Sequence, residues 1–115
     1  MSDAVKRFRE EREQLNEKVL AAGNLTVKRF FALDTQAYAA GALDAKTKEL
    51  IGLATSAVLR CDDCILYHII RSVEEGASDD EIVESLSIAL VVGGSIVIPH
   101  LRRAIDRLDE LRATE

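Results

Sequence analysis

The stretch Arg60-Cys61-Asp62-Asp63-Cys64-Ile65-Leu66-Tyr67-His68 organises the chain, because it holds both cysteines and one of the two histidines. In an α-helix, positions i, i+3 and i+7 lie within about 60° of one another, so Cys61, Cys64 and His68 would share one stripe. The two acidic residues between the cysteines are typical of a first helical turn, where they interact favourably with the backbone dipole. The motif therefore predicts a helix with the cysteine pair at its N-terminus.

Local signals on both sides of the motif indicate the neighbouring helices. Asp44 is a candidate N-cap for a helix from about residue 45 to residue 59. The motif helix itself is expected to run over residues 62–75, where apolar side chains form a wide face beside the cysteines and the histidine. Gly76 is placed to end that helix. We therefore expect the reactive stripe to border the core.

The C-terminal part of the chain begins with a strong helix signal and then becomes ambiguous. Ser78 and Glu81 have the spacing of a capping box, which predicts the start of another helix. Residues 88–98 could form either a hairpin about a Gly-Gly turn or two helices with a break between them. The second interpretation is preferred, because Ser95 can cap a new helix and Pro99 fits its first turn.

Two more helices are expected before the motif. Residues 3–21 carry a narrow apolar stripe among many charges, and Gly23 is placed to stop this helix. Thr26 is a candidate cap for a second helix over residues 27–40. Its apolar residues recur at helical spacing, and we expect its three aromatic side chains to lie in the core: Phe30, Phe31 and Tyr38.

Length and composition favour a single small helical domain. A chain of 115 residues is long enough for one core, and 48% of its residues are hydrophobic although only 4% are aromatic. An aliphatic, alanine-rich core of this kind favours helices over strands. We expect an all-α fold, a compact bundle of about six helices over residues 1–115, with residues 1–24 as an N-terminal helical arm.

Charge and hydropathy exclude several classes of partner. The formal net charge of −5 argues against nucleic acid, whose phosphates call for a basic surface. The N-terminus has no apolar signal region and no apolar run approaches the ~20 residues of a membrane span, so we expect no membrane partner and a cytoplasmic location. Two cysteines in a reducing compartment are more often catalytic or metal-binding than a structural disulfide.

The residue types in the motif suit thiol redox chemistry. A helix N-terminus lowers the pKa of a thiol, and His68 lies one turn after Cys64, where it can take and return a proton. Cys64 could then attack a peroxide to give a sulfenic acid, and Cys61 could resolve it as a disulfide. The carboxylates of Asp62 and Asp63 act in the opposite direction, because like charge raises the pKa of a thiol.

Alternatives remain open for each of these residues. The cysteines could be inert core packing, and His68 a half-buried structural histidine. A zinc site could add His100 as a fourth ligand, although one helix separates positions i and i+7 by about 10 Å, which strains a tetrahedral site. C-type haem is excluded, because no histidine directly follows the second cysteine.

Glu49, twelve residues before Cys61, completes a recognisable pattern. Spacing alone slightly favours an ordinary surface charge for it, beside Lys46 and Lys48. The whole pattern of Glu49, Cys61-x-x-Cys64 and His68, however, resembles the signature of the alkyl hydroperoxidase D-like branch of the carboxymuconolactone decarboxylase family. The resemblance covers roughly residues 25–108.

The resemblance implies a function and a site. It implies a thiol-dependent peroxidase or disulfide oxidoreductase with four catalytic positions, in which Cys64 attacks, Cys61 resolves, His68 carries the proton and Glu49 orients or charges the histidine. In the peroxidase for which the branch is named, one of the two residues between the cysteines is a histidine, where this chain has only aspartates.

The implied partners are a small-molecule peroxide and a dithiol reductant, with a lipoyl-linked dithiol as one candidate, and no cofactor or metal is expected. The resemblance also suggests a homo-oligomer, a trimer or hexamer. The alternative function is a non-catalytic or redox-sensing helical assembly protein of the same family. Lactone decarboxylation is disfavoured, since it does not depend on a pair of cysteines.

Overall fold

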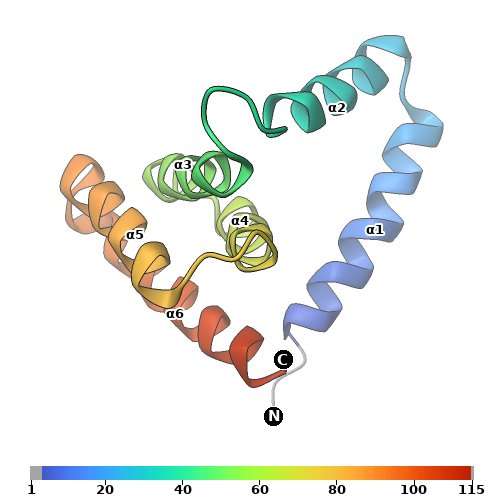
Figure 1. Cartoon of the computed structure of the whole chain (residues 1–115). Helices are drawn as coiled ribbons and strands as arrows, with labels where there is room; N and C mark the ends of the chain where they lie inside the picture. The colour runs from blue at the N-terminus through green and yellow to red at the C-terminus, as the bar shows by residue number, and fades with distance from the viewer. Residues whose placement is uncertain (1–3, 115) are drawn as a thin grey trace. The chain divides into compact units, whose positions relative to one another are not determined.

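The computed structural model describes residues 4–114, and the regular elements in this range are six α-helices and one short 3₁₀ helix (Figure 1). The prediction of an all-α fold with about six helices is therefore confirmed. The described residues divide into two units, one that ends at residue 39 and one that begins at residue 40. Between residues 4 and 114, no helix is both long enough and apolar enough to cross a membrane.

The first unit contains α1 (Ala4–Ala22) and α2 (Leu25–Ala37). Gly23 separates them as predicted, and a Cβ atom at this position would lie only 2.7 Å from the carbonyl oxygen of Val19. The predicted cap Thr26 is wrong, since Asn24 caps α2 by accepting a hydrogen bond of 3.2 Å from the backbone N–H of Val27. The first position of the predicted helix over residues 3–21 lies outside the described residues.

The aromatic residues of α2 do not form the expected core. Phe30 is 67% exposed, and α2 buries none of its residues. Phe31 and Tyr38 are only half-buried, and neither belongs to the buried core. Helical spacing can indicate an apolar face, but a face is buried only where another element covers it. The prediction that Phe30, Phe31 and Tyr38 lie in the core is therefore wrong.

The second unit contains α3 (Ala45–Val58), α4 (Asp62–Glu74), α5 (Asp79–Gly93) and α6 (Ile98–Ala113). Helix α3 packs against both α4 and α5, and α4 also packs against α6. The core between them is aliphatic, as the composition predicted. Its largest fully buried apolar side chains are Leu53, Ile69, Ile82, Leu86 and Val97.

The ends of these helices follow the predicted signals. Asp44 caps α3 by accepting a 2.7 Å hydrogen bond from the N–H of Thr47. Ser78 and Glu81 form the predicted capping box at the start of α5. Gly76 follows α4 with φ of +88°, a left-handed conformation that glycine adopts without steric cost. Local chemistry therefore sets these three boundaries.

The ambiguous segment is helical, with a break. Helix α5 extends to Gly93, and residues Ser95–Val97 form a 3₁₀ turn that leads into α6. Pro99 lies in the first turn of α6 as predicted, but Ser95 makes no capping hydrogen bond through its side chain. The chain enters α6 directly from the 3₁₀ turn, so the prediction of a serine cap is wrong.

The capping box should contribute measurably to stability. We expect Ser78→Ala to lower the free energy of unfolding by about 1 kcal/mol, because the backbone N–H of Glu81 loses the Ser78 hydroxyl that accepts its hydrogen bond at the start of α5. The other bond of the capping box, from the backbone N–H of residue 78 to the Glu81 carboxylate, does not need the serine side chain. Urea denaturation would measure the change. Ser87→Ala is the matched control, since the Ser87 hydroxyl only donates to the backbone carbonyl of Val83 on the same helix; an equal loss in both variants would contradict a capping role.

Candidate functional site

The cysteine motif is positioned by a tight link between α3 and α4. At the end of α3, the N–H of Arg60 donates to the carbonyl of Ala57 and the N–H of Cys61 donates to that of Ser56. This is the Schellman arrangement, and Arg60 occupies its left-handed position with φ of 60°, where glycine is usual. Cys61 is also the N-cap of α4. The last turn of one helix therefore fixes where the next begins.

Cys61 and Cys64 are joined by a disulfide, with their Cα atoms 5.3 Å apart. The N–H of Cys64 lies 3.2 Å from the sulfur of Cys61 and donates to it, as a side-chain acceptor at an N-cap does. Cys61 is partly buried, whereas Cys64 is exposed. Of the two sulfurs, the one expected to attack therefore lies in the more accessible residue.

Glu49 and His68 meet inside the second unit. Oε1 of Glu49 lies 2.9 Å from Nδ1 of His68, and only 2% of Glu49 and 8% of His68 is exposed. The interpretation of Glu49 as a surface charge is thus wrong. Helical spacing could not reveal this contact, because its partner lies on α4, nineteen residues along the chain.

The contact with Glu49 defines the tautomer of His68. A carboxylate oxygen can only accept a hydrogen bond, so Nδ1 of His68 carries the hydrogen and donates it. In the neutral imidazole, Nε2 then carries the lone pair and is the atom able to take a proton. Cys64 lies four residues before His68 on the same helix, at the spacing of neighbouring side chains.

Arg71 provides a second partner for the buried carboxylate. Its Nε lies 3.6 Å from Oε2 of Glu49, and its other nitrogens pair with Glu74 at 2.7 Å and Glu75 at 3.1 Å. The hydrogen bond to Glu74 and the charge of Glu49 raise the pKa of Arg71 despite its partial burial. A buried carboxylate needs such compensation, and sequence analysis did not identify Arg71 as its source.

A second ionic cluster surrounds Asp62, the residue after Cys61. His100 Nδ1 lies 2.7 Å from Oδ1 of Asp62, and Arg103 Nε lies 2.7 Å from Oδ2. Partial burial acts to raise the pKa of Asp62, but the hydrogen bonds and charges of His100 and Arg103 outweigh it and lower this pKa. Sequence analysis treated His100 as a possible zinc ligand and missed both contacts.

Comparison with known proteins shows to which family the chain belongs. The model of the carboxymuconolactone decarboxylase family matches residues 24–107, which include Glu49, both cysteines and His68. The chain belongs to the carboxymuconolactone decarboxylase family. Its resemblance to the narrower alkyl hydroperoxidase D-like branch remains a prediction.

Similar proteins come from several bacteria. A protein of known crystal structure from Thermotoga maritima is 65% identical to this chain, with a TM-score of 0.90. The match covers 93% of this chain and 91% of the Thermotoga chain. That protein is described as a carboxymuconolactone decarboxylase family protein with a suggested part in the antioxidative response. An apo family protein from Legionella pneumophila is 28% identical, with coverage of 95% and 97% and a TM-score of 0.86. An uncharacterized protein of the cox locus of Paracoccus denitrificans is 35% identical over 71% of this chain and 74% of its own length.

The structure does not support the alternative of a zinc site at the cysteine motif. In residues 4–114, no group of three or more histidine, cysteine, aspartate or glutamate side chains could hold a metal ion. His100 pairs with Asp62, and both cysteines are held in the disulfide.

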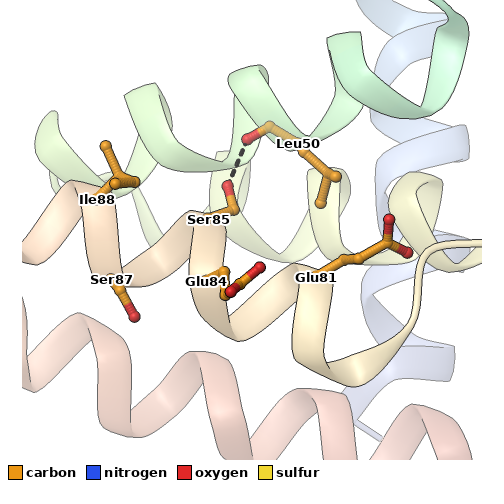
Figure 2. A pocket seen from close by; sticks show the side chains of 6 residues that line it. All are labelled: Leu50, Glu81, Glu84, Ser85, Ser87 and Ile88. Atoms are coloured by element: carbon orange, nitrogen blue, oxygen red, sulfur yellow. Dashed lines mark hydrogen bonds between the residues drawn. The ribbon is translucent and has the colours of Figure 1, made fainter.

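A surface hollow between α3 and α5 is lined by other residues than those of the cysteine motif. Leu50 of α3 lines it together with residues of α5, and the Ser85 hydroxyl donates a 2.7 Å hydrogen bond to the Leu50 carbonyl (Figure 2). The glutamates Glu81 and Glu84 give the hollow an acidic edge. None of the four predicted site residues lines it.

The ionic cluster around Asp62 should appear in the pH dependence of stability. Because its pKa is lower in the folded chain than the ordinary value of 3.8, ionised Asp62 stabilises the fold above that value, and the contribution is lost as the pH falls through the lower folded pKa. We expect Asp62→Asn to cost about 0.5–1 kcal/mol near pH 7, a range suited to an exposed ion pair, and progressively less below pH 4. Urea unfolding at several pH values would measure this.

Asp63→Asn is the matched control, because Asp63 is exposed and lies in the same first turn of α4. A constant difference between Asp62→Asn and the wild type from pH 7 down to pH 3 would contradict the assignment.

Proposed function

We propose that this protein is a thiol-dependent peroxidase that reduces hydroperoxides through the Cys61–Cys64 pair and is recycled by a dithiol. The observation that carries the proposal is the buried hydrogen bond between Glu49 and His68, one turn from Cys64. A buried, oriented acid–base pair beside two cysteines is a typical arrangement for activating a thiol. Membership of the family, and the antioxidative description of the Thermotoga relative, support the same chemistry.

The first step consumes the peroxide. His68 Nε2 takes the proton of the Cys64 thiol, and the thiolate attacks the terminal peroxide oxygen. The O–O bond breaks, Cys64 becomes a sulfenic acid, and the leaving alkoxide receives the proton from His68 to give an alcohol. Glu49 acts as a positioning residue, because it holds Nδ1 and balances the charge of the imidazolium while the proton is on the ring.

The second step forms the disulfide, and the third reverses it. Cys61 attacks the sulfur of the Cys64 sulfenic acid, so the S–S bond forms and water leaves. A dithiol reductant then supplies two electrons and two protons, which restores both thiols and leaves the reductant as its own disulfide. The Cys61–Cys64 disulfide supports this scheme, because it shows that the two sulfurs can bond to each other within this fold.

Peroxide consumption with a dithiol donor tests the proposal. We expect the wild type to turn over, Cys64→Ser to lose activity at least 100-fold, and Cys61→Ser to react once and then stall as a sulfenic acid, because its resolving thiol is missing. Rate assays with several dithiols, a lipoyl-linked one among them, and mass spectrometry of Cys61→Ser would measure both effects. Disulfide formation without turnover for every donor would favour the alternative, a redox-sensing assembly protein.

We also propose that the protein is a homo-oligomer, a trimer or hexamer. The end of α3 and the outer face of α5 form an apolar surface with a hollow of about 410 Å³, lined by Ala54, Thr55, Val58, Leu59, Ile88, Ala89 and Val92. Two of the large apolar side chains that line it are strongly exposed in the single chain, Leu59 at 77% and Val92 at 70%. Exposed apolar patches of this kind are common where protein surfaces associate.

Light scattering tests the oligomer. We expect more than one chain per particle at micromolar concentration, and Val92→Glu should shift the distribution toward the monomer, because a charge would have to be buried in the interface. Val83→Glu is the matched control, since Val83 lies on the same helix but does not line the hollow. A wild-type monomer would refute the proposal.

A further inference from the structure

Two side chains of helix α6 contact Asp62, the residue next to Cys61. This aspartate directly follows Cys61 and lies in the first turn of α4, yet both of its carboxylate oxygens are held by α6. Oδ1 pairs with Nδ1 of His100 and Oδ2 with Nε of Arg103, each at 2.7 Å. The two contacts span 38 and 41 residues of sequence, so the fold rather than the local chain creates them.

The hydrogen positions in this cluster follow from the chemistry of the groups. Nδ1 of His100 must donate to Asp62, because a carboxylate only accepts. The same nitrogen lies 3.3 Å from an Arg103 nitrogen, which is also a donor, so these two groups are neighbours and not hydrogen-bonded partners. Asp62 therefore receives one hydrogen bond from each side chain, and Arg103 adds a full positive charge.

The charge of Asp62 matters because of its place beside Cys61. At the N-terminus of α4 the helix dipole favours thiolates, whereas a nearby carboxylate opposes them. Asp62 and Asp63 together would cancel much of the benefit that the helix provides. With Arg103 against it, Asp62 and its partner have no net charge, and this opposition is largely removed.

We propose that Arg103 and His100 are positioning residues that neutralise and orient Asp62 and so keep the cysteine pair acidic enough to react. The consequence for turnover rests on the proposed function, but the effect on the thiols does not. The charged and titratable groups at the pair and at its contacts come from three helices and one link: Glu49 on α3, paired with His68; Arg60 in the link before α4; Asp62, Asp63 and His68 on α4; and His100 and Arg103 on α6.

The proposal predicts a simple charge balance. Arg103→Gln leaves Asp62 uncompensated and should raise the lower of the two thiol pKa values by about half a unit to one unit, the scale expected for one charge several ångströms away near a surface. Asp62→Asn should lower that pKa by a similar amount, because Arg103 is then uncompensated. The double variant restores neutrality, and its thiol pKa should return close to the wild-type value.

The test is a titration of the reduced protein, in which absorbance at 240 nm reports the thiolate from pH 4 to pH 10. Arg102→Gln is the matched control, because it removes the same charge from an exposed neighbour on α6 with no contact to Asp62. Arg103→Lys keeps the charge and should retain most of the wild-type pKa, even if the geometry of the contact changes. Thermal unfolding of the same samples reports any structural effect separately.

The outcomes separate an electrostatic role from a structural one. If the cluster only ties α6 to α4, the double variant should be the least stable while every thiol pKa stays at the wild-type value, which would overturn the proposal. An equal rise of the pKa in Arg102→Gln and Arg103→Gln would also overturn it, since the effect would be one of overall charge. Because the titration uses no peroxide, its result is independent of whether the proposed peroxidase activity is found.

Discussion

The buried hydrogen bond between Glu49 and His68 is the interaction on which the site depends. Burying a carboxylate that is only 2% exposed is costly unless the carboxylate is paired. Here the imidazole of His68 donates to it at 2.9 Å, and Arg71 is a second partner at 3.6 Å. The bond joins α3 to α4 across their packed faces. It therefore sets the tautomer of the histidine and also its position relative to the cysteines on α4.

The cysteine pair is positioned by a short link between two helices. The link between α3 and α4 has no spare residue, because Arg60 ends one helix in a left-handed conformation and Cys61 begins the next. Helix α6 adds the contacts to Asp62 from the other side. Three helices thus meet at one short motif, and the charges that favour a thiolate come from tertiary structure as well as from the dipole of α4.

Features with local causes could be predicted from the sequence, and features with distant causes could not. The caps at Asp44 and Ser78 and the stop at Gly76 depend on a few neighbouring residues and were predicted correctly. The burial of Glu49 depends on a residue of another helix, so spacing favoured the wrong alternative. The prediction that Phe30 is buried was wrong for the same reason, since an apolar face does not show whether another element covers it.

A double-mutant cycle on the rate of Cys64 oxidation tests the central claim, that Glu49 acts on the thiol through His68. The rates of wild type, Glu49→Gln, His68→Ala and the double variant would be measured with one peroxide across pH 5 to 9. We expect Glu49→Gln to slow oxidation and displace its pH dependence, yet to add little in the His68→Ala background. Additive losses in the double variant, or an unchanged rate and pH profile in Glu49→Gln, would contradict the account.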